Sequence, residues 1–252
     1  MKNGYAASSR NIKLTIQYDG THYAGWQFQK NGRSIQEAIQ DAIKKITGKK
    51  AKLIGSGRTD AGVHAEAQVA NFKTRSRIPL KNLQMAINSA LPDDIVISKI
   101  EEVASRFNAQ HDAKSKLYRY TVVNNDFVSP MLRRYAAKCF YKIDIDLMKR
   151  AAKLLVGRHD FTSFRTIDGE EKNAIRTIRR IKIEKLKDVI CIDIEANGFL
   201  YNMVRTIVGT LIEVGRGKFT VGRVREILKK RDRKCSGPTM PAKGLCLVKV
   251  FY

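Results

Sequence analysis

The apolar residues of this chain repeatedly change from a two-residue spacing to a helical spacing, and this alternation limits the folds open to it. In the segment NIKLTIQYDG every second side chain is apolar, which is typical of a strand buried on one face. From residue 35 the apolar spacing becomes helical; Ser34 and Glu37 before it fit a capping box, and Gly48 follows it. A strand followed closely by an amphipathic helix indicates an α+β fold.

The same alternation continues to the C-terminus. We expect further strands at residues 50–55, 68–73, 95–100, 117–124, 179–186, 189–196 and 245–252, and helices at residues 80–90, 147–156, 203–215 and 221–228, with Gly215 and Thr220 as caps. No low-complexity linker divides the chain. We therefore predict two α/β halves, each an antiparallel sheet backed by helices, with an active-site cleft between them. The predicted parts are an N-terminal extension (1–10), an N-terminal α+β domain (11–110) and a C-terminal α+β domain (111–252).

The charge of the chain indicates a polyanionic partner. It has 48 Lys and Arg against 24 Asp and Glu, a formal net charge of +24, which favours nucleic acid. The alternative is a merely solvated basic surface. No apolar run is long enough to span a membrane, and the N-terminal MKNGYAASSR lacks the apolar middle of a signal peptide. We expect a cytoplasmic protein that does not contact membranes.

The cysteines and histidines do not form a metal-binding pattern. They are widely spaced, with no C-x-x-C pair, so we expect reduced packing cysteines and no metal site. These residues are Cys139, Cys191, Cys235, Cys246, His22, His64, His111 and His159.

The stretch GSGRTDAGVHA, from Gly55 to Ala65, combines several glycines with one acid among basic groups. It does not fit a phosphate cradle, because a Walker loop ends in Gly-Lys followed by Ser or Thr, and Asp60 repels phosphate. From this loop alone, the capping of a turn is favoured over a chemical role for Asp60. The glycines are expected to leave room for an RNA backbone.

Four motifs in order, YDGTHYAGWQ, GSGRTDAGVHA, GRHDFTSF and FLYNMVRTIVGTL, resemble those of the tRNA pseudouridine synthase A family. The tail PTMPAKGLCLVKV is similar to the family's ending, although Met240 and Cys246 stand where Ala and an aromatic residue are expected. The resemblance implies the pseudouridine synthase fold and conversion of uridine to pseudouridine at positions 38–40 of the tRNA anticodon stem-loop. It also implies a homodimer. No cofactor is expected, because the isomerisation is redox-neutral.

The resemblance also implies roles for individual residues. Asp60 is the expected catalytic carboxylate, as nucleophile, oxocarbenium stabiliser or base. Arg58 is expected to fill the space of the flipped base or to contact a phosphate. Tyr118 is expected to stack on that base or to take the C5 proton. An ion pair with Arg205 is expected to keep Asp60 ionised, and His64 is a further substrate-binding candidate.

Several readings stay open beside these assignments. Trp26 stacks on RNA or anchors the core, and Asp160 and Phe161 are expected to support the cleft. Basic runs at residues 114–119, 133–134, 176–187 and 229–234 are expected to contact phosphates. An RNA-binding protein without catalytic activity is the main competing hypothesis. That hypothesis gives no role to the charged side chain of Asp60.

Overall fold

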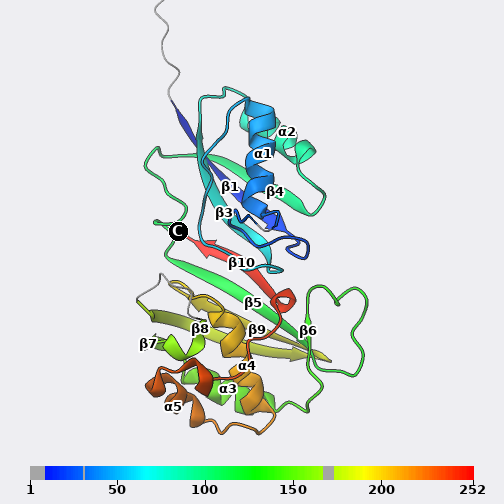
Figure 1. The fold of residues 1–252 in the computed structure, drawn as a ribbon, viewed down its shortest axis with the longest axis vertical. Helices are drawn as coiled ribbons and strands as arrows, with labels where there is room; N and C mark the ends of the chain where they lie inside the picture. The colour runs from blue at the N-terminus through cyan, green and yellow to red at the C-terminus, as the bar shows by residue number, and fades with distance from the viewer. Residues whose placement is uncertain (1–8, 31, 167–172) are drawn as a thin grey trace, which may run out of the picture. The chain divides into compact units, whose positions relative to one another are not determined.

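A computed structural model of the chain describes residues 9–30, 32–166 and 173–252 (Figure 1). Most of the predicted N-terminal extension, residues 1–8, lies outside the described residues. The described residues form two compact units. The N-terminal unit comprises the residues up to Ala113 together with Tyr252, and the C-terminal unit comprises Lys114–Phe251. Both units contain a sheet and helices, so the predicted α+β class is confirmed.

The sheet of the N-terminal unit has β1 at its centre, antiparallel to β3 on one side and to β4 on the other. In this register Leu14 lies opposite both Ala70 and Ile100. The α2 helix contacts β4, and α1 packs against α2. The elements are β1 (Arg10–Tyr18), α1 (Ile35–Thr47), β2 (Ile54–Gly55), β3 (His64–Thr74), α2 (Leu80–Ala90) and β4 (Ile95–Val103).

The predicted caps of α1 are confirmed. The Ser34 hydroxyl accepts a hydrogen bond from the Glu37 amide at 3.2 Å, and the Glu37 carboxylate accepts one from the Ser34 amide. At the other end Gly48 adopts the left-handed conformation and donates its amide to the Lys44 carbonyl. The apolar side of the helix is buried, with Ile39 and Ile43 fully covered.

The strand predicted at residues 50–55 is wrong except for its last two residues, β2. The glutamine side chains of α1 explain the difference. Gln40 donates its amide to the Ala51 carbonyl at 2.7 Å, and Gln36 donates to the Leu53 carbonyl at 2.9 Å. Because helix side chains satisfy these carbonyls, the segment does not need a neighbouring strand.

The sheet of the C-terminal unit has the strand order β10-β5-β9-β8-β7, with antiparallel pairing throughout. The short β6 pairs with β5 in parallel, so the predicted antiparallel pattern holds except at this edge. The α3 helix contacts α4 and β8, and α4 contacts β5 (Figure 1). The elements are β5 (Ser115–Val123), β6 (Ala137–Lys138), α3 (Ile145–Lys153), β7 (Gly157–Asp160), β8 (Ile175–Leu186), β9 (Val189–Ala196), α4 (Met203–Gly215), α5 (Arg223–Lys230) and β10 (Leu245–Phe251).

Two predicted helix ends in this unit need correction. Gly215 is the last residue of α4 rather than its cap, and Gly217, with φ of +80°, makes the turn after it. A Cβ atom at Gly215 would lie 2.8 Å from the Met148 side chain, so this glycine lets α3 approach closely. Thr220 does not directly precede α5, but its hydroxyl accepts a bond from the Arg223 amide at 3.3 Å.

The α3 helix starts two residues earlier than predicted and ends at Lys153. Asp144 sets the start, since its carboxylate accepts hydrogen bonds from the amides of Asp146 and Leu147. All four cysteines are free thiols, as predicted. Within the described ranges, no helix has both the length and the apolar character that a bilayer crossing requires.

Candidate active site

The first half of the Gly55–Ala65 loop is tied to β3 by a buried glutamine. The Ser56 amide donates to the Val69 carbonyl at 2.7 Å, and the Ser56 hydroxyl donates to the Gln68 side chain at 2.6 Å. Gln68 in turn donates its amide to the Gly57 carbonyl at 3.0 Å. Gln68 is fully buried, so these bonds are shielded from water and hold the entry to the loop.

The second half of the loop is held around Asp60. The Thr59 carbonyl accepts a bond from the Trp26 amide at 3.0 Å, and the Thr59 hydroxyl lies 2.8 Å from the Tyr18 hydroxyl. The Asp60 carbonyl accepts a bond from the Val63 amide at 3.1 Å, which closes a turn. The backbone of Asp60 is thereby fixed on both sides, while its side chain lies half-buried.

The segment after β1 runs against this loop with backbone touching backbone. A Cβ atom at Gly25 would lie 2.6 Å from the Thr59 carbonyl oxygen, and Gly25 has φ of +96°. A Cβ atom at Gly20 would lie 2.0 Å from the Val63 carbonyl oxygen. No larger residue fits at either place, so the motifs YDGTHYAGWQ and GSGRTDAGVHA form one packed structure.

The space beside Gly55 is occupied by the protein itself. A Cβ atom at Gly55 would lie 2.6 Å from the Trp26 indole ring. The expectation that this glycine leaves room for an RNA backbone is therefore wrong. Trp26 is 3% exposed and lies near the Tyr18 ring, so it anchors the core.

Two further loop residues differ in exposure. His64 is buried, and its Nδ1 atom lies 3.1 Å from the Gly20 amide and 3.1 Å from an Asp19 carboxylate oxygen. These contacts hold the segment after β1 beside the start of β3. Arg58 is exposed and makes no ion pair with any residue in the described ranges.

In the C-terminal unit, Tyr118 lies on β5 and is 7% exposed. Its ring meets the Phe199 ring edge-on, with centroids 5.1 Å apart. Ile194 and Leu247 lie opposite it on the two neighbouring strands. The side chain is therefore held by packing, and only a small part of its surface is open.

Arg205 lies on α4 and is positioned by the tail of the chain. Its Nε donates to the Met240 carbonyl at 2.6 Å, and its Nη1 donates to the Asn202 side chain at 2.7 Å. The acceptor at residue 240 is a backbone carbonyl. The presence of Met240 where the family has Ala therefore does not remove this hydrogen bond. Nearby, the Tyr120 hydroxyl donates to the Pro241 carbonyl at 2.7 Å, and burial raises the pKa of Tyr120 above its ordinary value.

The motif GRHDFTSF packs under α5. Phe161 and Phe164 are fully buried. Asp160 accepts two hydrogen bonds from Thr162 and pairs with Arg231 at 3.0 Å. Burial opposes ionisation of Asp160, but these hydrogen bonds and the charge of Arg231 outweigh it and lower the pKa of the carboxyl.

Several cations in the predicted phosphate-contacting runs already have acidic partners. Arg119 makes two hydrogen bonds of 2.8 Å to Asp193, and Arg180 lies 3.1 Å from Glu195. These cations contribute less to RNA attraction than their number indicates. In the described part of the chain, no three metal-ligating side chains gather in one place.

The predicted site residues divide between the two units. Arg58, Asp60 and His64 belong to one loop of the N-terminal unit, whereas Tyr118 and Arg205 belong to the C-terminal unit. The loop anchors Tyr18 and Gln68 were not predicted. The sequence places both residues on strands, which predicts that their side chains are buried but does not predict that they hold the loop.

Comparison with known proteins identifies the family. The profile of the family described as tRNA pseudouridine synthase matches residues 14–112 and 151–252. The tRNA pseudouridine synthase A of Thermoanaerobacter sp. (strain X514) is 49% identical over 243 residues, 96% of this chain and 100% of that protein. The chain belongs to the tRNA pseudouridine synthase family. It is therefore a pseudouridine synthase, an isomerase that acts on uridine in tRNA.

Other relatives agree with this assignment. The tRNA pseudouridine synthase A of Acetivibrio thermocellus is 48% identical, and tRNA pseudouridine synthase A 2 of Clostridium perfringens is 49% identical, each over 96% of this chain and 100% of the relative. A chain in the crystal structure of a Cbf5–Nop10–Gar1 complex is 12% identical in sequence, with a TM-score of 0.41. The match covers 94% of this chain and 58% of that one. The family profile matches the loop residues and Arg205. Tyr118 lies in the interval that it does not match.

Proposed function

We propose that this enzyme isomerises uridines at positions 38–40 of the tRNA anticodon stem-loop, with Asp60 as the catalytic carboxylate. The observation that carries the proposal is the loop around Asp60. Buried hydrogen bonds fix its backbone from Ser56 to Val63, while the carboxylate itself is only half-buried. A charged group that is held in place in advance loses little free energy to reorganisation during a reaction.

The reaction needs one well-placed carboxylate and no external reactant. The bond from uracil N1 to ribose C1′ breaks, the base turns, and C5 bonds to the same carbon. N1 gains a proton and C5 releases one, so atoms and electrons balance without a redox partner. Asp60 can act as nucleophile, as stabiliser of the sugar cation or as base at the ribose.

The other residues are proposed in supporting roles. Arg58 is exposed with no ion pair in the described residues, which favours a contact with RNA during base extrusion. Tyr118 presents little surface, which favours a contact through one edge or its hydroxyl. Arg205, oriented by Met240, is proposed to keep the carboxylate ionised. His64 is proposed to position the loop, because it is buried.

The family resemblance adds two further proposals, a homodimer and a reaction without cofactor or metal. Light scattering of the free enzyme and of its tRNA complex tests the first. For the second, turnover is measured before and after treatment with a chelator. We expect no change, and a loss of turnover by a protein that remains folded contradicts the proposal.

The central test replaces Asp60 with asparagine, which keeps the shape of the side chain but removes its charge. Tritium release from tRNA labelled at uridine C5 should fall at least about a thousandfold. Binding of tRNA and the melting temperature should stay near those of the native enzyme. Asp41→Asn, on the exposed side of α1, is the matched control.

Two outcomes contradict the proposal. If Asp60→Asn releases tritium at the native rate, Asp60 is not the catalytic group. If the native enzyme binds tRNA without releasing tritium, the chain is an RNA-binding protein instead. Sequencing of the product for pseudouridine decides separately whether positions 38–40 are the targets.

A further inference from the structure

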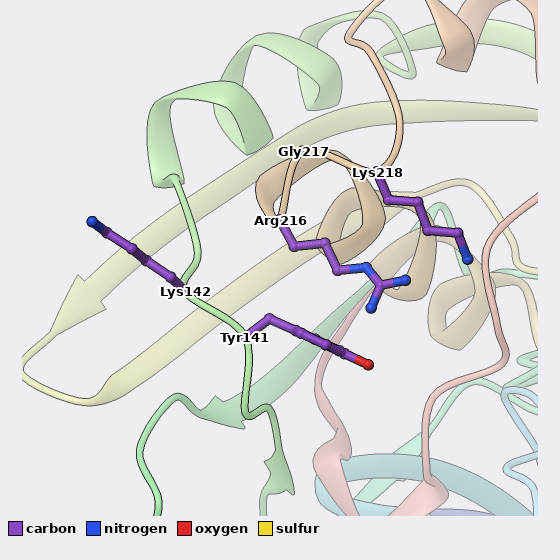
Figure 2. Close-up of a pocket in the computed structure, with 5 residues that line it drawn as sticks. All are labelled: Tyr141, Lys142, Arg216, Gly217 and Lys218. Atoms are coloured by element: carbon purple, nitrogen blue, oxygen red, sulfur yellow. The ribbon is translucent and has the colours of Figure 1, made fainter.

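A pocket of about 440 Å³ opens on the surface of the C-terminal unit, and none of the residues assigned above lines it. It is lined by Tyr141 and Lys142, before α3, and by Arg216, Gly217 and Lys218, directly after α4. In Figure 2, the Tyr141 and Arg216 side chains extend side by side in the same direction, Lys218 lies beyond Arg216, and the Lys142 side chain points away from the other three. The pocket is a shallow, widely open depression rather than an enclosed cavity.

The charges around the pocket leave an excess of positive charge. Glu213 is buried and accepts ion pairs from Arg216 at 2.9 Å and from Lys218 at 3.2 Å. One carboxylate neutralises one of these two cations. Lys142 is exposed and has no ion pair within the described residues. The pocket therefore attracts an anion. Lys142 is free to reorient because its side chain reaches into solvent, whereas Lys218 is exposed but shares the Glu213 carboxylate with Arg216.

The pocket also has an aromatic wall. The Arg216 guanidinium lies 4.1 Å from the centre of the Tyr141 ring, a cation–π stack that covers one face of the ring. Tyr141 is still 53% exposed, so its other face is open. Because Arg216 is itself fixed by Glu213, the ring is held in place before any ligand arrives.

We infer that this pocket binds one unpaired nucleotide of the tRNA substrate, with the base stacked on Tyr141 and its phosphate contacted by Lys218 and Lys142. An aromatic face beside exposed cations is an arrangement by which proteins hold single-stranded nucleic acid. The site offers no set of fixed polar groups that would select a free nucleotide, whereas a polymer held elsewhere needs only stacking and charge. The inference rests on the tRNA substrate and is independent of the role of Asp60.

The test measures equilibrium binding of a full-length tRNA over a series of KCl concentrations. Tyr141→Leu should weaken binding by about tenfold, from lost stacking, without changing the salt dependence. Lys218→Ala should lower the slope of log K against log salt by about 0.7 to 0.9, from one lost phosphate contact. Phe28→Leu and Lys99→Ala, exposed residues of the N-terminal unit, are the matched controls.

A second probe separates stacking from simple charge. Tyr141→Leu should lose affinity for a single-stranded oligouridine but not for an RNA duplex, whose paired bases cannot stack on the ring. Tritium release at saturating tRNA should keep the native kcat while KM rises. Equal losses for both probes overturn the inference, as does tRNA binding in both variants that matches the controls. A lowered melting temperature with unchanged tRNA binding also overturns it, since the cluster then only stabilises the end of α4.

Discussion

The Gly55–Ala65 loop and the turn from Glu213 to Lys218 both place one acid and basic residues beside glycines, yet they are built in opposite ways. In the first, a Cβ atom at Gly55 would meet the Trp26 ring, and Gly25 of the neighbouring segment packs directly against the loop backbone. In the second, Gly215 still packs against Met148 at the end of α4, but a Cβ atom at Gly217, in the turn itself, would meet nothing within 4 Å. Similar composition thus produces a packed loop in one unit and an open turn in the other.

The two acids are held differently as well. Hydrogen bonds fix the backbone around Asp60, which is half-buried, whereas Glu213 is buried and its carboxylate pairs with Arg216 and Lys218. A group that reacts needs a rigid support and an accessible side chain. A group that only orders its neighbours is best buried. The support of the acid is therefore more informative about its role than the number of charges near it.

The largest effect is expected from a comparison of Gly25 and Gly217. Both have a positive φ, but only Gly25 is closely packed. Gly25→Ala should destabilise the protein by more than about 3 kcal/mol, because strain at φ of +96° adds to a clash with the Thr59 carbonyl. Gly217→Ala should cost only about 1 kcal/mol, because only the backbone strain applies. Denaturant unfolding of both variants measures the difference.

Turnover gives this pair a second readout. The fraction of the Gly25→Ala protein that remains folded should show a lowered kcat, because the clash lies beside Asp60. Gly217→Ala should keep the native kcat. Equal destabilisation of the two variants would show that the packing of the loop contributes nothing beyond the strain of its glycine.

A smaller effect is expected from two Tyr→Phe changes, which remove only a hydroxyl. Tyr18→Phe should cost about 1 to 2 kcal/mol, because it removes the 2.8 Å bond to the buried Thr59 hydroxyl. Tyr141→Phe should change stability by less than about 0.5 kcal/mol, since the stacked ring remains. Thermal unfolding and kcat are measured for both variants. If only Tyr141→Phe lowered kcat, the Tyr141 hydroxyl, and not the Tyr18 hydroxyl, would be the one that turnover needs.

The smallest effect concerns Asp160, a motif acid that contacts Thr162 and Arg231. Asp160→Asn should cost about 1 kcal/mol at neutral pH, because the amide is a weaker acceptor for Thr162 and carries no charge for Arg231. Folding lowers the pKa of Asp160, so the ionised carboxylate stabilises the native protein relative to the variant. This stabilisation is fully present above the unfolded pKa of about 3.9. It is lost as the pH falls through the lower folded pKa.

Unfolding of the native protein and of this variant over a pH series checks the sign. The two curves should converge toward acid pH. A gap that stays constant shows that the charge of Asp160 does not stabilise the fold.

The sequence was most informative where one local pattern determined one element. The capping box and the terminal glycine gave α1 its true ends, since these interactions lie within a few residues of each other. The strand at residues 50–55 failed because two glutamines of α1 took its carbonyls. Periodicity records which side chains are apolar and does not record which partner a carbonyl finds.

The candidate site was predictable to a similar degree. The family motifs point to Asp60, but they do not reveal that Gln68 and Tyr18 hold its loop. The turn after α4 was missed because Gly215 was taken for the cap, and only the position of Met148 shows that Gly215 serves packing instead. Long-range contacts of this kind have no signature in a short window of sequence.

The close approach of Gly25 and Gly20 to the backbone of the loop has a practical consequence for anyone who wishes to re-engineer this enzyme. Side chains can be exchanged one at a time, but two touching main chains can be changed only together. A transplant of Gly55–Ala65 into another scaffold has to bring residues 19–26 with it. For the same reason, libraries that randomise one segment alone should yield mostly inactive clones.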